Sequence, residues 1–168
     1  MKKILLLTLC LPLFTFAQST GYELTGKFKT VEKEKGEEQQ RLRGEIRVDE
    51  AVKVLQIDLR RMNPTVSGNI KVAWVVLIKD MQGKLRGVGK GEQKMAADVG
   101  IPIQIESETF QLKEVRMDGR GARDRKMEQE IEGYGVVIVD LKGEEVGARF
   151  QPKSIETQAR ALLKGEKR

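Results

Sequence analysis

Alternation of apolar and polar residues with a period of two dominates the chain after residue 21. This period is typical of β-strands that bury one face and leave the other in water. In one alternating segment the apolar positions change phase between Val54 and Leu55, so we expect a β-bulge there, which lets a strand change its buried face. The alternating segments lie near residues 22–30, 42–48, 52–59, 101–105 and 110–115.

Two other segments, residues 70–78 and 134–139, are apolar at odd and even positions alike. This pattern predicts central strands that are covered on both faces. Each is followed by an Asp-x-x-Gly sequence, which is typical of a type I turn and predicts a hairpin. The partner strands are expected to begin near Leu85 and Glu145.

The remaining segments are connections and one helix. Residues 32–40, 63–69 and 117–127 are polar and are predicted as loops, and the glycines of residues 83–91 favour a twisted or bulged edge strand. Beyond Pro152 the apolar residues follow a helical spacing, and we expect a short helix that packs weakly or frays. These helical positions are Ile155, Ala159, Leu162 and Leu163.

Seven to nine short strands with a turn every 8–12 residues predict an all-β protein, an antiparallel sandwich with a short C-terminal helix. The chain has 168 residues, a length typical of one domain. We expect the sandwich to span residues 18–152, and the helix with a basic tail to span residues 153–168.

The first 17 residues have the layout of a secretory signal peptide. A basic start with Lys2 and Lys3 precedes an apolar run over residues 4–16, and Thr15-Phe16-Ala17 places small residues before a cleavage point. We expect cleavage after Ala17 and export to the periplasm or the extracellular space. An uncleaved N-terminal anchor is the alternative, and a lipid-modified Cys10 is less favoured because Leu9 precedes it.

Composition limits the chemistry of the mature chain. The sequence has no His and one Cys, and cleavage removes this cysteine, so Ser-His-Asp and thiol chemistry are excluded. Cleavage also removes Lys2 and Lys3, which lowers the net charge from +6 to +4. No later segment is apolar enough to span a membrane. No calcium-loop pattern is present, and we expect no metal and no cofactor.

Two aromatic residues carry a resemblance to a known fold. Trp74 lies on a predicted central strand, and Tyr134 is followed by alternating valines and the turn glycine Gly143. This arrangement resembles that of immunoglobulin-like and fibronectin-III-like domains over residues 71–150, without the cysteine pair of antibody domains. The resemblance implies a sandwich and leaves the function open.

The strongest candidate for a binding site is a basic segment over residues 116–126. Arginines on a loop bind phosphate, sulfate or carboxylate groups well, so this segment predicts an anion site or a site for an acidic glycan. A solvated loop is the alternative, because Glu128, Glu130 and Glu132 follow directly. No aromatic residues interleave, so nucleic acid is not expected. The candidate residues are Arg116, Arg120, Arg123, Arg125 and Lys126.

Other catalytic patterns are weak. The glycines of residues 83–91 do not fit a phosphate-binding loop, because positions 84 and 91 hold Lys and Gly. Two acid pairs, Glu106 with Glu108 and Glu144 with Glu145, are predicted to be exposed, and a carboxylate-based hydrolase is the least favoured class.

We therefore expect an exported, non-enzymatic module that binds an envelope or secreted protein, or adds a strand to a partner. The alternative is binding of an acidic polymer through the basic segment.

Overall fold

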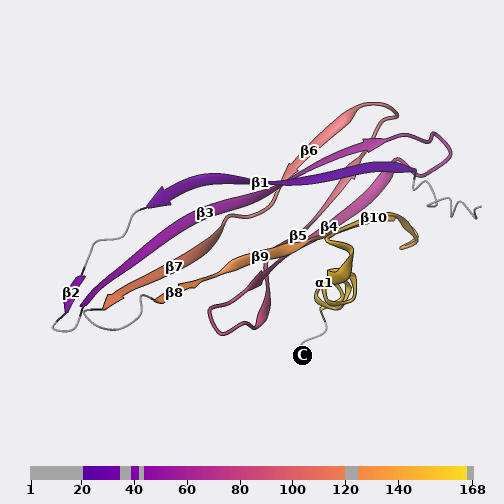
Figure 1. Cartoon of the computed structure of the whole chain (residues 1–168). Coiled ribbons are helices and arrows are strands. Elements are labelled where there is room, and N and C mark those ends of the chain that lie inside the picture. The colour runs from indigo at the N-terminus through magenta and orange to yellow at the C-terminus, as the bar shows by residue number, and fades with distance from the viewer. Residues whose placement is uncertain (1–20, 35–38, 42–43, 120–124, 166–168) are drawn as a thin grey trace, which may run out of the picture.

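The computed structural model describes residues 21–34, 39–41, 44–119 and 125–165. They form two antiparallel sheets and a short C-terminal helix, which confirms the all-β sandwich (Figure 1). The predicted signal peptide lies outside the described residues. The first sheet holds β1 (Tyr22–Glu34), β2 (Gln39–Arg41), β3 (Gly44–Arg61), β6 (Pro102–Glu106), β7 (Phe110–Gly119) and β8 (Arg125–Glu128). The second sheet holds β4 (Asn69–Lys79), β5 (Leu85–Ala96), β9 (Glu130–Asp140) and β10 (Glu145–Gln151).

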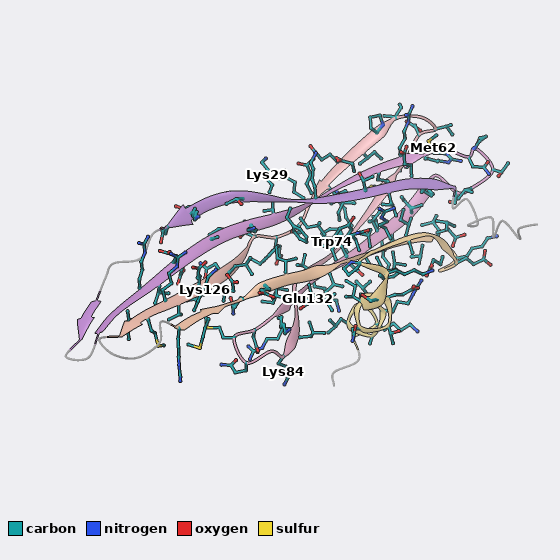
Figure 2. The ribbon with its side chains drawn as sticks, viewed as in Figure 1. Lys29, Met62, Trp74, Lys84, Lys126 and Glu132 are labelled. Carbon is teal, nitrogen blue, oxygen red and sulfur yellow. The ribbon has the colours of Figure 1, made fainter. Side chains whose placement is uncertain are left out.

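The core lies between the inner faces of the two sheets. Leu55, Ile57 and Leu59 of β3 face buried apolar residues at even-numbered positions of β4 and β9. Trp74 lies in this core, as expected of its place on a central strand (Figure 2). The Phe28 ring packs edge-on against Tyr134 at 5.9 Å between centroids. This apolar packing holds the two sheets together.

The second sheet is also covered on its other face. Val75 and Leu77 of β4 are fully buried there against Ala159 and the rest of α1 (Glu156–Leu163), which follows the single turn η1 (Lys153–Ile155). The prediction of central strands buried on both faces is therefore confirmed for β4.

The prediction that the C-terminal helix packs weakly is wrong. Ala159 is fully buried, and Gly135 and Gly87 leave the space in which the helix lies, because a Cβ atom on Gly135 would come within 2.8 Å of Ala159 Cβ. Arg160 donates two hydrogen bonds to the Glu145 carboxylate, at 2.6 and 3.0 Å. These bonds hold the pKa of Glu145 below its ordinary value.

Both Asp-x-x-Gly hairpins are confirmed. In the first, Asp80 Oδ1 accepts hydrogen bonds from the backbone N–H groups of Gln82 and Lys84, and Gly83 takes a φ of 81°. Asp140 makes the equivalent bonds in the second hairpin, where Gly143 has a φ of 85°. The edge strand predicted from the glycines of residues 83–91 is also confirmed, as β5.

The bulge expected between Val54 and Leu55 is wrong. The pairing of β3 with β1 continues without a shift through these residues, and the register shift lies on β1, between Thr30 and Glu32. Since side chains alternate strictly along an unshifted strand, Val54 and Leu55 face opposite sides of the sheet.

The loop predicted over residues 117–127 is wrong at both ends. β7 continues to Gly119 and pairs with β8, which begins at Arg125, so these residues belong to an antiparallel hairpin. Residues 120–124 lie outside the described residues. Part of β1 likewise extends into the predicted connection at residues 32–40, as far as Glu34.

One arginine connects two segments of the chain at the end of the sandwich where β3 ends. The Arg61 guanidinium donates hydrogen bonds to the carbonyl oxygens of Ala97 at 3.2 Å, Pro64 at 2.7 Å and Val66. It therefore joins the predicted loop of residues 63–69, which is confirmed as a connection, to the segment that follows β5.

Replacing Arg61 tests this connection. We expect Arg61→Met to lower the free energy of unfolding by about 2–3 kcal/mol, because three carbonyl groups lose a charged donor. The neighbouring Arg60 is the matched control, since it donates only to the Gly100 carbonyl from an exposed position. Arg60→Met should cost less than about 1 kcal/mol. Equal losses of unfolding free energy for the two variants in urea would show that the Arg61 hydrogen bonds do not stabilise this connection.

Candidate functional site

The described members of the basic segment lie on two faces of the first sheet. Arg116 and Lys126 are directly opposite each other in the β7–β8 pair, so they share one face, while Arg125 is opposite Met117 on the other face. Arg120 and Arg123 lie outside the described residues. The described cations of the predicted anion site are therefore not gathered on a single surface.

Carboxylates already neutralise Arg116 and Lys126. Arg116 Nε lies 2.5 Å from Glu114 Oε1, and Lys126 Nζ lies 2.7 Å from Glu128 Oε2 and 3.5 Å from Glu114 Oε2. The hydrogen bond from Arg116 holds the pKa of Glu114 below its ordinary value, and the bond to Glu128 raises the pKa of Lys126. An anion would have to displace these acidic partners, so the geometry does not favour an anion site here.

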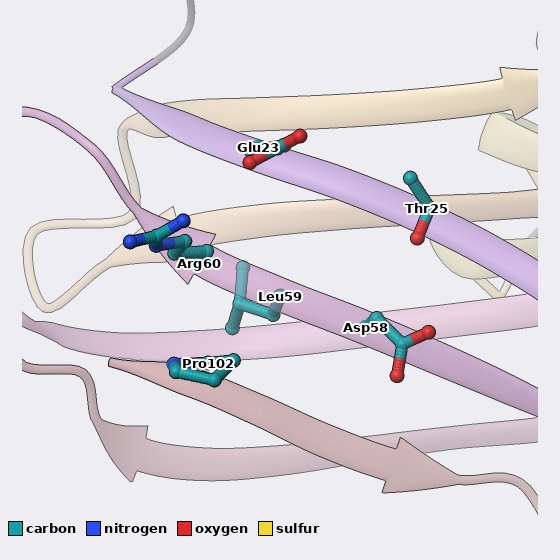
Figure 3. Close-up of a pocket in the computed structure, with 6 residues that line it drawn as sticks. All are labelled: Glu23, Thr25, Asp58, Leu59, Arg60 and Pro102. Atoms are coloured by element: carbon teal, nitrogen blue, oxygen red, sulfur yellow. The ribbon is translucent and has the colours of Figure 1, made fainter. Parts of the chain in front are cut away.

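A shallow hollow of about 190 Å³ lies on the outer face of the first sheet, across β1, β3 and β6 (Figure 3). Its polar centre is Asp58, whose Oδ1 accepts hydrogen bonds from Gln56 and Gln104, both at 3.2 Å. Lys27 Nζ lies 3.5 Å from the other oxygen. Because the carboxylate has these partners already, the hollow is a polar surface rather than a site arranged for proton transfer. Its lining residues are Glu23, Thr25, Asp58, Leu59, Arg60 and Pro102.

In each predicted acid pair, one of the two glutamates forms an ion pair with a basic side chain. Glu106 is exposed and lies 3.7 Å from Lys29 Nζ, while Glu145 is bound by Arg160. Glu108 and Glu144 are exposed. Neither pair lies in a cavity that could give its two carboxyl groups different pKa values, as a glycosidase requires.

The most distinctive surface is at the other end of the first sheet. An extension reaches beyond the second sheet, and we call it the arm (Figure 1). It consists of β2, β8, residues 44–54 of β3, residues 111–119 of β7 and residues 29–34 of β1. Lys126 marks it in Figure 2. The face of the arm that continues the core is charged, with Arg47 and Asp49 2.9 Å apart beside the pairs of Glu114.

The opposite, outer face of the arm is apolar. Cross-strand pairing places its side chains side by side, because residues directly opposite in a sheet share one face. Val48 pairs with Val115, and Val115 pairs with Met127, which is 37% exposed. We call this group the arm face, and it consists of Ile46, Val48, Val115, Met117 and Met127.

None of the arm-face residues belongs to either buried cluster of the described residues. The helix α1 covers the second sheet, so no described element forms a third layer over the arm face. Adjacent apolar side chains that no described part of the same chain covers are typical of an interaction surface.

Sequence reasoning missed this surface, although the signal was present. The phase change between Val54 and Leu55 marks the point at which the apolar residues of β3 pass from the outer face to the core face. A bulge and a change of face produce the same sequence pattern, and only the pairing of β3 with β1 distinguishes them.

Comparisons with known proteins identify no family for this chain. No protein family and no curated protein matches the sequence. Among solved structures, a Northeast Structural Genomics Consortium target matches with a TM-score of 0.35 and 13% identity, over 77% of this chain and 81% of that one. A protein from Akkermansia muciniphila matches with a TM-score of 0.34 and 10% identity, over 82% and 75%.

A long apolar helix is not found in the described part of the chain, where none reaches the length and hydropathy needed to cross a membrane.

Two lysine substitutions test the change of face on β3. Val48→Lys should lower the free energy of unfolding by less than about 1 kcal/mol, because Val48 lies on the outer face of the arm. Ile57→Lys should cost more than about 4 kcal/mol or prevent folding, because it buries an unpaired charge in the core. Similar losses of unfolding free energy for the two variants, measured by thermal and urea unfolding, would refute the assignment of these residues to opposite faces.

A third substitution tests whether Glu114 neutralises the basic segment. At pH 7, Glu114→Gln should bind heparin more tightly than the natural protein, and so elute at higher salt, because Arg116 and Lys126 lose an acidic partner. The pKa of Glu114 is depressed, so the natural protein keeps this carboxylate until the pH falls through that lowered value.

The difference between the two proteins should therefore vanish at a pH below that value. Glu92→Gln is the control, since Glu92 pairs with Lys71 on the second sheet. An unchanged elution of Glu114→Gln at pH 7 would show that Glu114 does not limit anion binding.

Proposed function

We propose that this protein is an exported, non-enzymatic interaction module, which binds a protein of the cell envelope or a secreted protein through the arm face. The observation that carries this proposal is a cluster of five apolar side chains on an extension outside the core, of which Met127 is exposed and the others are half-buried. A protein that needed this segment only for its own stability would bury these side chains in itself.

The proposed location rests on the first 17 residues, whose basic, apolar and small-residue segments are typical of a secretory signal. The proposed relationship to immunoglobulin-like domains is supported by Trp74 and Tyr134, which both pack in the core between the sheets. Such sandwiches present binding surfaces on a rigid framework, which fits an interaction role.

Strand addition at a sheet edge is less favoured than binding through the arm face. The exposed end of β1 carries the register shift near Val31 and the charged residues Glu32, Lys33 and Glu34, which are devices that discourage pairing with another chain. The β5 edge carries Arg86, paired with Asp80, and Lys90, which donates to the Leu162 carbonyl. A partner strand would have to disrupt these contacts.

Photo-crosslinking in the producing cells tests the proposal. A photoreactive residue at Met127 should form an adduct with a protein, because Met127 lies on the arm face. Leu141 is the matched control, since it is a more exposed apolar residue, 74% exposed, on an isolated turn. Adding Val115→Lys should remove the Met127 adduct while the melting temperature changes little.

The proposal fails if Met127 forms no adduct, or if Met127 and Leu141 form the same adducts in equal amounts. If added heparin prevented adduct formation while Val115→Lys did not, this would favour the acidic-polymer alternative.

A further inference from the structure

The arm face carries opposite charges at two corners. Arg125 lies on the edge strand β8, opposite Met117 of β7, which is itself opposite Ile46 of β3. Glu34 lies on the edge strand β1, opposite Glu50 of β3. Neither Arg125 nor Glu34 makes an ion pair with another described residue. On the same face Glu50 and Lys113 pair with each other at 2.7 Å, and Glu32 lies beside Glu34 on β1.

The two unpaired charges are symmetric about the centre of the arm face. Arg125 and Glu34 are four residues apart along the strands and three strands apart across them. At ~3.4 Å per residue and ~4.8 Å per strand, both separations are about 14 Å. The midpoint falls between Val48 and Val115, a cross-strand pair of the arm face.

We propose that two copies of this chain pack together through the arm face, around a two-fold axis that lies between the faces and passes over Val48 and Val115. This inference rests on the proposed function, because it uses the same surface and names the occupant. The axis places Arg125 of each copy over Glu34 of the other, and brings Val48 and Val115 of the two copies together near its centre. Equal separations along and across the strands make the strands cross at about 90°, one of the two favoured angles for packed sheets.

The charges favour a second copy over other occupants. A two-fold interface must be self-complementary, and a face with one positive and one negative corner around an apolar centre meets this condition. A nucleic acid or an anionic membrane would instead favour a face of uniformly positive charge. Glu34 and the neighbouring Glu32, on the same face, oppose such a surface.

The size of the arm face predicts the strength of association. The outer face of the arm extends roughly 20 Å along β3, from Ile46 to Val52, and its four strands span roughly 15 Å across. This area is well below the ~800 Å² per partner of a standard interface, so we expect a weak dimer, with a dissociation constant of roughly tens to hundreds of micromolar.

Charge reversal tests the two-fold arrangement. In sedimentation velocity over a concentration series, Arg125→Glu and Glu34→Arg should each raise the dissociation constant about tenfold or more, because each creates like-charge contacts. The double variant should return to within about threefold of the natural protein, because both ion pairs re-form with reversed signs. Lys142→Glu, on the distant β9–β10 turn, is the control and should change nothing. Circular dichroism checks that each variant is folded.

Three outcomes overturn the second copy as occupant. They are a monomer at every concentration, no recovery in the double variant, and association only with phosphatidylglycerol vesicles. If the purified protein is monomeric while Met127 forms an adduct with a different protein in cells, the proposed function stands and this inference fails. If Met127 forms no adduct and no dimer is found, both fail. An adduct with the mass of two copies, lost in Arg125→Glu and regained in the double variant, supports both.

Discussion

The unbroken alternation of side chains along β3, whose pairing with β7 has no shift, is the constraint on which the rest of this structure depends. A strand that pairs without a shift must alternate its side chains between two faces, so the sequence of β3 decides which face is apolar at each point. From Leu55 onward the apolar residues point into the sandwich, and before Val54 they point away from it. One strand of 18 residues therefore provides three residues of the core and, at its other end, an apolar surface that no other described element covers.

The main contacts of the sandwich do not involve the arm face. The core between the sheets, the helix under β4 and the Arg61 hydrogen bonds all lie away from the arm face. In the arm, ion pairs take the place of the core on the inner face, with Glu114 between Arg116 and Lys126. The basic segment is thus explained in part as the partner of acidic residues that hold two strands together, and the apolar outer face remains available for another molecule.

Features that depend on local chemistry were predictable from the sequence. Both hairpins follow from Asp80 and Asp140, whose side chains accept backbone hydrogen bonds within the turn itself. The features that were mispredicted depend on distant residues. The change of face at Val54 requires knowledge of the pairing with β1, and the tight packing of Ala159 requires the space that Gly135 leaves on β9. The β7–β8 hairpin escaped prediction because its charged sequence is typical of a loop until the cross-strand ion pairs are known.

Distances between spin labels on different copies test most directly the central claim, that two copies of this protein meet through the arm face. The only cysteine, Cys10, lies in the predicted signal peptide, so single cysteines can be introduced for labelling. Gln111 is exposed beside Val52 on the outer face of the arm, and Leu141 lies at the other end of the molecule. We predict a short intermolecular distance for labels at Gln111 and none for labels at Leu141. Equal distance distributions at the two sites, or no intermolecular distance at Gln111, would contradict this account.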